Sequence, residues 1–189
     1  MLHFMDKFNT KRLTAERLRQ EHLAELTIMH SDPVVMATLG GVRSATETAE
    51  YLAVNLEHWN RHNYGLWIFR DSEGKFVGRG GIRHIDVEGA DEIELAYSLM
   101  SEFWGRGLAT EMAEASLEMA FEHLNLDELI ALTTLANTAS RRVMEKMSFR
   151  FEREVLHHQS SCVLYRQNVQ MYRDGKQRSL KNQVHQAFS

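Results

Sequence analysis

The chain has 189 residues, of which 43% are hydrophobic and 25% are charged, and this composition predicts one soluble domain with a substantial core. Its formal net charge of −4 argues against a general nucleic-acid-binding protein, which usually carries a basic patch. The single cysteine, Cys162, excludes an intrachain disulfide. The first residues lack the apolar segment of a signal peptide, and no run of about 18 apolar residues could span a bilayer. We therefore expect a cytoplasmic protein that binds neither membranes nor nucleic acids directly.

The first third of the chain predicts a strand followed by helices. Partial alternation in residues 11–20 predicts a strand, and residues 21–30 predict a helix that is broken by the only proline, Pro33. A longer helix is expected after Ser44, because Glu47 completes a capping-box pattern and apolar residues then recur at helical spacing.

The middle of the chain changes to a period of two residues. Two apolar runs surround residues 71–74, Asp-Ser-Glu-Gly, and predict a hairpin. Residues 92–99 then alternate strictly, which predicts a strand with one apolar and one polar face. The apolar face would carry Ile93, Leu95, Tyr97 and Leu99, and the polar face Glu92, Glu94, Ala96 and Ser98.

A glycine-rich turn then leads directly into a long helical pattern, FWGRGLATEMAEASLEMAFEHL, at residues 103–124. A helix N-terminus presents unpaired N–H groups and the positive end of the helix dipole, which together attract anions. Gly105 and Gly107 would let a ligand approach the backbone without meeting a Cβ atom, so this segment suggests a phosphate-bearing ligand. The alternative is that the glycines only form a tight strand-to-helix turn.

The last third predicts a strand, a helix and two further strands. Residues 126–137 have the composition of a buried strand, residues 138–149 predict a short helix, and residues 150–158 and 161–173 predict the final strands. Residues 174–189 have little apolar periodicity, so we expect a peripheral tail that is a loose helix or disordered. The order of elements predicts a mixed α/β (α+β) domain over residues 1–173.

Two short motifs lie on these elements. Residues 104–109 read Trp-Gly-Arg-Gly-Leu-Ala, and a later segment carries Asn137, Ser140 and Phe149. Both resemble motifs of the GNAT acetyltransferase superfamily, most of all its branch of ribosomal-protein N-terminal acetyltransferases. The family's pyrophosphate loop is Gln/Arg-x-x-Gly-x-Gly/Ala, so Trp104 departs from it. In the second segment Ser148 stands where the family usually has glycine.

The resemblance implies a central, mostly antiparallel twisted sheet flanked by helices and splayed between its fourth and fifth strands, residues 93–99 and 129–134. It also implies acetyl-CoA as the co-substrate, without a metal. Asn137 would hydrogen-bond the pantetheine arm, although it is also a favourable N-cap for the following helix, and both roles can hold together. The implied acetyl-CoA-binding residues are Ala96, Tyr97, Ser98, Arg106, Gly107, Leu108, Ala109, Thr110 and Asn137.

Acetyl transfer to an amine needs a base for the amine and a donor for the leaving thiolate. The resemblance and the polar strand face favour Glu94 as the base, acting through a water, with Glu92 as the competitor. The alternative is that Glu94 is only a solvated strand carboxylate. Many family members use a tyrosine as the donor, but Met144 stands at that position. Ser140 is then the nearest matching hydroxyl, unless it is only a first-turn serine of its helix.

The histidines and acids allow further interpretations. His58 and His62 lie one helical turn apart and His157 and His158 are adjacent, but no third ligand is evident nearby, so exposed histidines are expected rather than a zinc site. The five acids between Asp86 and Glu94 would attract a cationic amine or would form a solvated hairpin face. The acceptor side of the fold is expected near residues 36–43 and the last two strands.

The sequence therefore predicts an acetyl-CoA-dependent N-acetyltransferase that acts on a primary amine, as a monomer or a homodimer. A protein N-terminal α-amine is the first expectation for the acceptor. A small-molecule amine such as a polyamine, an aminoglycoside or an amino-acid-like compound is the alternative. A non-catalytic acyl-CoA-binding module on the same fold is a further alternative.

Overall fold

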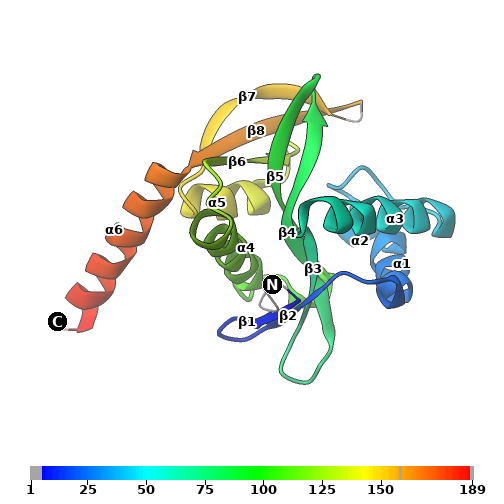
Figure 1. Cartoon of the computed structure of the whole chain (residues 1–189), viewed down its shortest axis with the longest axis horizontal. Helices are drawn as coiled ribbons and strands as arrows, with labels where there is room; N and C mark the ends of the chain where they lie inside the picture. Colours follow the sequence, from blue (N-terminus) through cyan, green and yellow to red (C-terminus); the bar gives the residue numbers. More distant parts are fainter. Residues whose placement is uncertain (1–5, 158, 188–189) are drawn as a thin grey trace.

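The computed structural model describes residues 6–157 and 159–187. Its centre is a mixed, mostly antiparallel sheet with the strand order β1-β2-β3-β4-β5-β6-β8-β7 (Figure 1). The strands are β1 (Lys7–Asn9), β2 (Thr14–Arg17), β3 (Leu66–Arg70), β4 (Phe76–Val87), β5 (Ala90–Leu99), β6 (Glu128–Thr133), β7 (Arg150–His157) and β8 (Ser160–Asn168). The helices are α1 (Leu23–Ser31), α2 (Pro33–Met36), α3 (Ala45–His62), α4 (Leu108–Glu118), α5 (Thr138–Lys146) and α6 (Val169–Ala187), with 3-10 turns at Gln20–His22 and Ser101–Phe103.

The sheet divides where β5 meets β6. Strands β1 to β5 pair antiparallel with their neighbours, and β6, β8 and β7 form a second antiparallel group. Between the groups, β5 and β6 run parallel and share a single register pair, Glu94 with Ile130. Beyond Glu94 the two strands diverge, so the predicted splay between residues 93–99 and 129–134 is confirmed.

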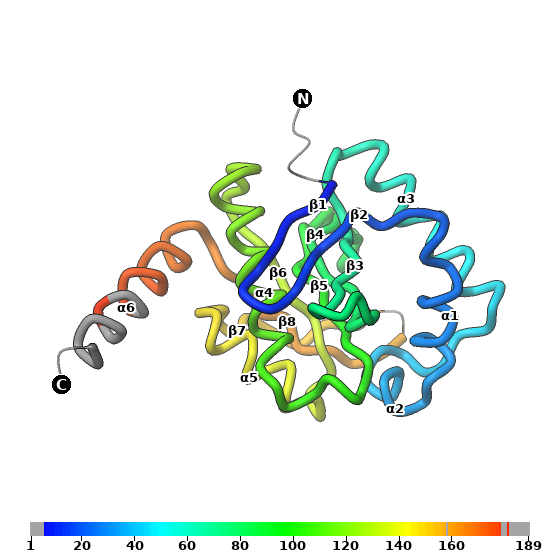
Figure 2. Tube along the Cα trace, turned by 90° about the horizontal axis from the view of Figure 1, so that it is seen from below, coloured from blue at the N-terminus to red at the C-terminus, as the bar shows by residue number. Residues whose placement is uncertain are grey.

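Helices cover both faces of the sheet, with α1 to α3 on one face and α4 and α5 on the other (Figures 1 and 2). Trp59 of α3 packs edge-on against Trp67 of β3, with ring centroids 5.2 Å apart. On the second face, α4 lies so close to β4 that a Cβ atom at Gly80 would come within 3.1 Å of Met112 Cε. This close packing fixes the start of α4 against the end of β5.

Local signals in the sequence account for several element boundaries. The predicted capping box at the start of α3 is confirmed, because Ser44 Oγ accepts from the Glu47 N–H at 3.2 Å and Glu47 Oε2 accepts from the Ser44 N–H at 2.8 Å. The predicted hairpin is confirmed too: the Gly74 N–H donates to the Asp71 carbonyl between β3 and β4.

Three features differ from the predictions. The strand expected over residues 11–20 is limited to β2, and it pairs with the unpredicted β1, whose three residues carry no clear pattern. The helix expected to run to residue 124 is π-helical at Met119–His123. The final strand ends at Asn168, because the Asn168 side chain accepts from the Met171 N–H and so caps α6.

The C-terminal helix α6 points away from the body of the domain (Figure 1). Its first turns are attached, because the Tyr172 hydroxyl donates to Glu122 at 2.7 Å and Lys176 forms an ion pair with the same carboxylate. The division into a domain of residues 1–173 and a peripheral tail of residues 174–189 stays a prediction.

Within the described residues, no helix combines the length and the apolar character that crossing a bilayer requires.

Candidate active site

The glycine turn forms the N-terminus of α4 as predicted. Gly107 is the N-cap with φ 74°, a left-handed conformation that favours glycine, and Gly105 has the same φ. The Glu111 N–H donates to the Gly107 carbonyl, so the preceding N–H groups of residues 108–110 lie at the positive end of the helix. Arg12 donates to the Arg106 carbonyl at 2.8 Å and to Glu111 at 2.6 Å, which ties the turn to the helix.

This turn opens into a cavity of about 440 Å³ bounded by β5, α4, α5 and α2. Most of the predicted acetyl-CoA-binding residues lie in its wall: Ala96, Tyr97, Ser98, Gly107, Leu108, Ala109, Thr110 and Asn137. Arg106 is not in that wall. Its guanidinium lies 5.4 Å from the centroid of the Phe103 ring. The expected contact of the pyrophosphate is with the backbone N–H of Arg106, and it stays a prediction.

The cavity fits acetyl-CoA at both of its ends. The N–H groups at the start of α4 are suited to a pyrophosphate, and the edge of β5 beyond Glu94 is left open to pair with an amide-bearing arm. Trp104, the residue that departs from the family motif, is half-exposed at this mouth, and its indole N–H donates to the Leu99 carbonyl at 2.9 Å.

Asn137 is the N-cap of α5, as its alternative role predicted. Its Oδ1 accepts from the Ser140 N–H at 3.1 Å, and its Nδ2 donates to the Thr38 hydroxyl at 3.0 Å. The side chain therefore connects α5 to the segment after α2. A hydrogen bond from Asn137 Nδ2 to the pantetheine arm would have to share or replace the bond to Thr38.

Ser140 meets Tyr97 across the cavity. The two hydroxyl oxygens are 3.0 Å apart, and the Tyr97 hydroxyl also lies 3.2 Å from the Ser140 carbonyl oxygen. Burial raises the pKa of Tyr97 to about 12, against the opposing effect of the Ser140 hydrogen bond. Met144, which replaces the family's tyrosine, lines the same wall. A tyrosine hydroxyl therefore reaches this place from β5 instead of from α5.

Glu94 is buried, with 7% of its surface exposed, so the polar face of β5 is not a solvated face. Helices α1 to α3 lie over this face of the sheet (Figure 1). Glu94 Oε2 accepts from Arg83 Nε at 3.0 Å. Burial tends to lower the pKa of Arg83, but the Glu94 carboxylate outweighs it and raises that pKa above its usual value.

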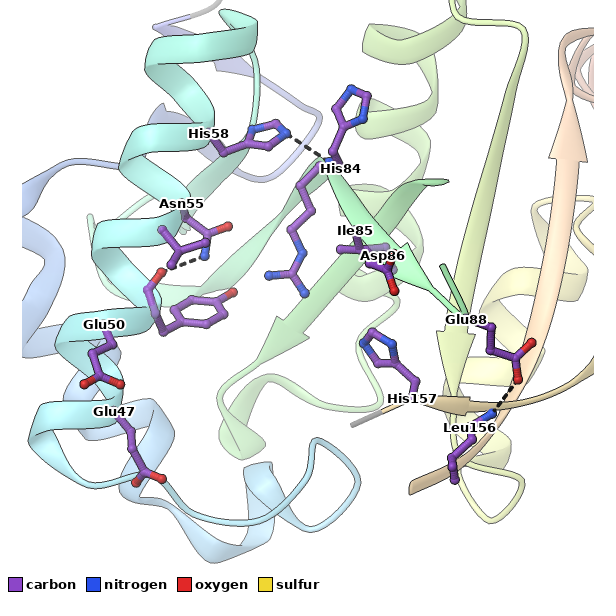
Figure 3. A pocket seen from close by; sticks show the side chains of 13 residues that line it. Glu47, Glu50, Asn55, His58, His84, Ile85, Asp86, Glu88, Leu156 and His157 are labelled. Carbon is purple, nitrogen blue, oxygen red and sulfur yellow. Dashed lines mark hydrogen bonds between the residues drawn. The ribbon is translucent and has the colours of Figure 1, made fainter. Parts of the chain in front are cut away.

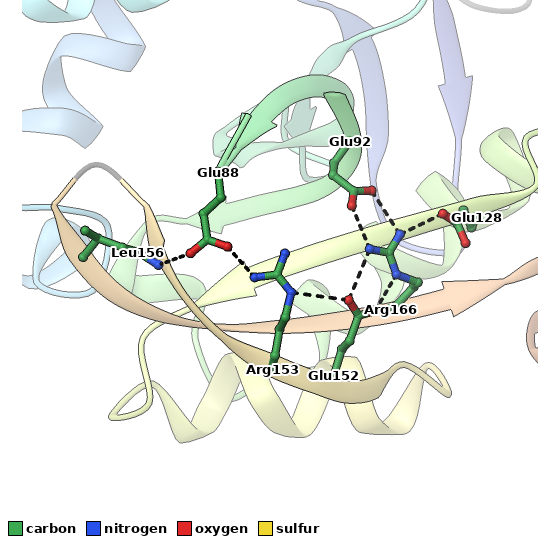
Figure 4. A network of polar contacts seen from close by, with 7 residues as sticks. All are labelled: Glu88, Glu92, Glu128, Glu152, Arg153, Leu156 and Arg166. Carbon is green, nitrogen blue, oxygen red and sulfur yellow. Dashed lines mark hydrogen bonds and ion pairs between the residues drawn. The ribbon is translucent and has the colours of Figure 1, made fainter. Parts of the chain in front are cut away.

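Glu92 lies outside this site, in a separate network of ion pairs (Figure 4). Arg166 of β8 binds both oxygens of Glu92 at 2.7 and 3.0 Å, and it also contacts Glu128 at 2.8 Å and Glu152 at 2.5 Å. Because Glu92 lines neither the acetyl-CoA cavity nor the neighbouring cleft, the geometry favours Glu94 over Glu92 as the base.

An open cleft of about 640 Å³ lies between α3, the β4–β5 hairpin and the end of β7 (Figure 3). Glu47, Glu50, Asp86 and Glu88 stand in its wall with His58, His84 and His157. Arg83 lines both this cleft and the acetyl-CoA cavity. Arg83 is therefore a wall shared by the two spaces, whereas Glu94 lines only the acetyl-CoA cavity. The cleft is a candidate path for the acceptor, formed by α3 and β7 more than by residues 36–43.

The acids of the β4–β5 hairpin are mostly neutralised by partners. Glu88 forms an ion pair with Arg153 at 2.5 Å (Figure 4), Asp91 lies 3.0 Å from His84 Nδ1, and Glu92 and Glu94 bind arginines. Glu88 and Glu92 join the hairpin to β7 and β8 through Arg153 and Arg166. Asp86, Glu88 and Asp91 are exposed, so this part of the run is solvated as the alternative expected.

The expectation of exposed histidines is wrong for His58, which is half-buried. Its ring stacks on His62 at 4.5 Å, and His62 stacks on His84 at 4.2 Å. His157 lines the cleft, and His158 lies outside the described residues. In residues 6–157 and 159–187, no group of three or more His, Cys, Asp and Glu side chains is placed to hold a metal ion.

The sequence interpretation missed the residues of β4 that face Glu94. Arg79 and Arg83 alternate with Gly81 on one face of β4, opposite Ser98, Glu94 and Ala96 in the register. Both guanidinium groups lie over the ring of Tyr51 from α3, at 5.0 and 5.7 Å from its centroid. The signal in the sequence was the alternation of arginine with glycine in residues 78–83, GRGGIR. Glycine leaves room for neighbouring long side chains, so this pattern could have indicated two arginines on one face of the strand.

A family model described as an acetyltransferase (GNAT) domain matches residues 12–150. The uncharacterized protein YkkB of Bacillus subtilis is 32% identical over 131 residues, which cover 68% of this chain and 75% of YkkB. The FsC-acetyl coenzyme A-N(2)-transacetylase of Aspergillus fumigatus is 30% identical over 148 residues, which cover 72% of this chain and 61% of that enzyme.

Solved structures agree with this assignment. An acetyltransferase from Agrobacterium tumefaciens has a TM-score of 0.76 and 25% identity, covering 86% of this chain and 94% of its own. The ribosomal L7/L12 alpha-N-protein acetyltransferase RimL, solved with coenzyme A, shares the fold with a TM-score of 0.67 at 16% identity, covering 86% of this chain and 97% of its own. The chain belongs to the GNAT acetyltransferase family, whose members transfer acetyl groups from acetyl-CoA.

Proposed function

We propose that the protein transfers the acetyl group of acetyl-CoA to a primary amine, and that its first acceptor is the α-amine of a protein N-terminus. One observation carries the proposal: Arg83 lines both the cavity that fits acetyl-CoA and the open cleft, and it binds Glu94 in the wall of the cavity. In the proposal, an amine that enters through the cleft passes Arg83 to reach the Glu94 carboxylate. The open side of the cleft gives the remainder of a peptide chain a path outward.

Glu94 is the base in this proposal. It receives the proton of the acceptor ammonium through a water, because a carboxylate is a weak direct base for an α-amine, whose pKa is about 8. The nitrogen then forms a bond to the acetyl carbon while the bond from that carbon to sulfur breaks. The Arg83 hydrogen bond fixes the orientation of the Glu94 carboxylate during these steps.

The leaving sulfur is stabilised by the hydroxyl of Ser140. Ser140 lies in the cavity wall, and Tyr97 holds it through the 3.0 Å contact between their hydroxyl oxygens. Because burial raises the pKa of Tyr97 to about 12, this hydroxyl stays protonated at neutral pH and is available as a donor. The Tyr97–Ser140 pair therefore supplies the function that a tyrosine at position 144 would supply.

A small-molecule amine is the second candidate acceptor. It is favoured by the Aspergillus fumigatus relative, whose name describes acetyl transfer from coenzyme A to a compound abbreviated FsC. The buried charges around Glu94 also suit a compact polar acceptor. A location in the cytoplasm and a monomeric or homodimeric state remain predictions.

A panel of acceptors tests these candidates. Peptides with different N-terminal residues and small amines, including polyamines, aminoglycosides and amino acids, are incubated with acetyl-CoA. Released CoA is measured, and the acetylated nitrogen is located by mass spectrometry. Acetylation of peptide α-amines at rates above those of all small amines supports the first candidate, and the reverse order supports the second. Tight acetyl-CoA binding without transfer to any amine would contradict both.

A further inference from the structure

We propose that the acceptor carries a carboxylate a few carbon atoms from its reacting amine, and that Arg79 and Tyr51 bind this carboxylate. The inference rests on the proposed function, because it takes the amine to lie beside Glu94. It adds an anion-binding subsite that fixes the class of acceptor.

Arg79 is a buried cation whose Nε lacks a hydrogen-bond partner among the described residues. Only 5% of its surface is exposed, and it lines the acetyl-CoA cavity, whose wall also includes Val35 and Leu39 of the α2 segment. Its Nε is fully buried, and no described residue accepts a hydrogen bond from it. A buried guanidinium without an acceptor is costly, which is why such groups are usually paired or bind a ligand.

Three arginines lie over the Tyr51 ring, against two carboxylates: Glu94 is bound by Arg83, and Glu47 interacts electrostatically with Arg43. Arg43, like Arg79 and Arg83, lies over the Tyr51 ring, with its guanidinium 5.1 Å from the centroid. The Glu94 carboxylate in this cluster is engaged by Arg83 at 3.0 Å. Burial and the positive charges of Arg83 and Arg43 lower the pKa of Arg79 from its usual value, against the opposing effects of Tyr51 and Glu94. An anion beside Arg79 would remove this repulsion.

His30, which also contacts Tyr51, adds no charge. Its Nε2 lies 3.3 Å from Arg43 Nη1, which can only donate, so Nε2 accepts and Nδ1–H points to the Thr48 hydroxyl at 3.2 Å. Burial lowers the pKa of His30 to about 3, and the nearby arginines act in the same direction. The ring is therefore neutral at neutral pH and does not alter the surplus of cations.

Tyr51 brings a second donor without a partner. Its hydroxyl oxygen is buried, and no hydrogen-bond partner for it lies in the described part of the chain. Tyr51 lines the cleft and Arg79 lines the acetyl-CoA cavity, and the Arg79 guanidinium lies over the Tyr51 ring at the boundary of the two spaces. A carboxylate bound at this boundary would accept from both the Tyr51 O–H and the Arg79 Nε–H and satisfy the two groups together.

The position of the subsite defines the spacing between the amine and the carboxylate. Arg79 is opposite Ser98 and Arg83 is opposite Glu94 in the register, so the Cα atoms of the two arginines are about 13 Å apart along β4. Both long side chains converge on Tyr51, and this shortens the distance between their charges. A carboxylate at Arg79 and an ammonium at Glu94 therefore match a zwitterion of amino-acid size.

Two sources supply this chemistry, and the experiment separates them. One is a free amino acid, and the other is a peptide whose first residue has an acidic side chain. In the first arm, kcat/KM is measured for free amino acids and for the corresponding amino-acid amides, which keep the amine but lose the carboxylate. In the second arm, amidated peptides that start with Asp or Glu are compared with those that start with Asn or Gln.

Wild-type protein should prefer the acid over its amide at least tenfold in one arm, because losing a charge-assisted hydrogen-bond partner costs about 1.5 kcal/mol or more. Arg79→Met should abolish the preference, and Tyr51→Phe should reduce it. Arg61→Met, at an exposed position, is the control and should keep the preference for the acid. Acetyl-CoA affinity, measured by calorimetry, should be the same in all variants.

Binding is also measured without turnover. N-Acetylated amino acids, in the presence of CoA, should raise the melting temperature of the wild type but not of Arg79→Met. Equal kcat/KM for acid and amide overturns the proposal, as does a preference that survives Arg79→Met. Weaker acetyl-CoA binding by Arg79→Met also overturns it, because Arg79 would then serve the co-substrate. Failure of the proposed function is distinguishable, since no amine of the wider panel would then be acetylated.

Discussion

His58 Nε2 accepts a hydrogen bond from the backbone N–H of His84 across 2.9 Å, and this bond joins α3 to β4 at the edge of the acceptor cleft (Figure 3). Since a backbone N–H can only donate, Nε2 carries no proton, and Nδ1–H donates to the Tyr64 carbonyl at 2.9 Å. Burial lowers the pKa of His58 to about 4, and the neighbouring His62 acts in the same direction. The fold therefore requires this histidine to be neutral.

This requirement predicts a pH-dependent stability. In the unfolded chain His58 takes up a proton near its ordinary pKa of 6.5, whereas in the folded chain it does so only near pH 4. The unfolded state thus binds more protons in this window, and the free energy of unfolding falls as the pH falls from about 6.5 to about 4. Denaturant unfolding at a series of pH values should show a shallower fall in His58→Gln. An unchanged slope in His58→Gln would contradict the assignment.

Glu94→Gln should lower kcat much more than it changes acetyl-CoA affinity. Glutamine keeps an oxygen for Arg83, so the fold should persist, but it cannot take up the acceptor's proton. Loss of a general base typically lowers the rate by about 10²- to 10⁴-fold. Rates against pH for the wild type and the variant, with affinity from calorimetry, provide the measurement.

Glu92→Gln is the matched control for Glu94→Gln. Glu92 lies two residues from Glu94 on the same strand, but it binds Arg166 and lines neither the acetyl-CoA cavity nor the cleft. The kcat of Glu92→Gln should stay near that of the wild type, while its free energy of unfolding falls by about 1 kcal/mol. If Glu94→Gln retains the full rate and the wild-type pH profile, Glu94 is not the base.

Arg166 should stabilise the junction between β5 and β6, two strands that share only one register pair. Its guanidinium binds carboxylates from β5, β6 and β7 (Figure 4), close to the single register pair of β5 with β6. Arg166→Met leaves three carboxylates together, so the free energy of unfolding should fall by about 2 kcal/mol or more, and less in high salt. Arg61→Met, which breaks an exposed pair with Glu57, should cost less than about 1 kcal/mol. Equal losses in the two variants would contradict this role.

Most of the fold could be predicted from local sequence signals. The capping box at Ser44, the hairpin turn ending at Gly74 and the strict alternation of β5 depend on neighbouring residues, which a sequence displays directly. β1 could not be predicted, because its three residues owe their conformation to pairing with β2. The change from β8 to α6 depends on the cap by Asn168, a residue that is also common in turns.

The candidate site could be predicted from the sequence only where it is formed by a continuous segment of the chain. The glycine turn and the edge of β5 belong to continuous segments, and the cavity forms there. Arg79 and Tyr51 come from β4 and α3, and only tertiary packing brings their side chains together. The same is true of Tyr97, whose contact with Ser140 requires β5 and α5 to meet across the splay.

We expect substitutions of Tyr97 and Ser140 to have coupled effects on kcat, because both hydroxyls lie where the thiolate leaves. Ser140→Ala should lower kcat by about tenfold, the scale of one hydrogen bond to a charged group. Tyr97→Phe should have a smaller effect, because Ser140 remains. The double variant should lose less than the product of the two single losses, since both hydroxyls act on the same sulfur. Strictly multiplicative losses, measured with one acceptor under saturating acetyl-CoA, would show that the residues act independently.

Gly107→Val should greatly weaken acetyl-CoA binding while the protein stays folded. Gly107 has φ 74°, and a β-branched residue is strained there, so the N–H groups at the start of α4 would be displaced. Gly74→Val is a control with the same kind of strain, because Gly74 has φ 80°, lies outside the cavity wall and has open space around its Cβ position. Both variants should lose about 1–2 kcal/mol of stability, but only Gly107→Val should lose affinity, by at least tenfold in calorimetry. Unchanged affinity in folded Gly107→Val would refute the assignment of this turn to the pyrophosphate.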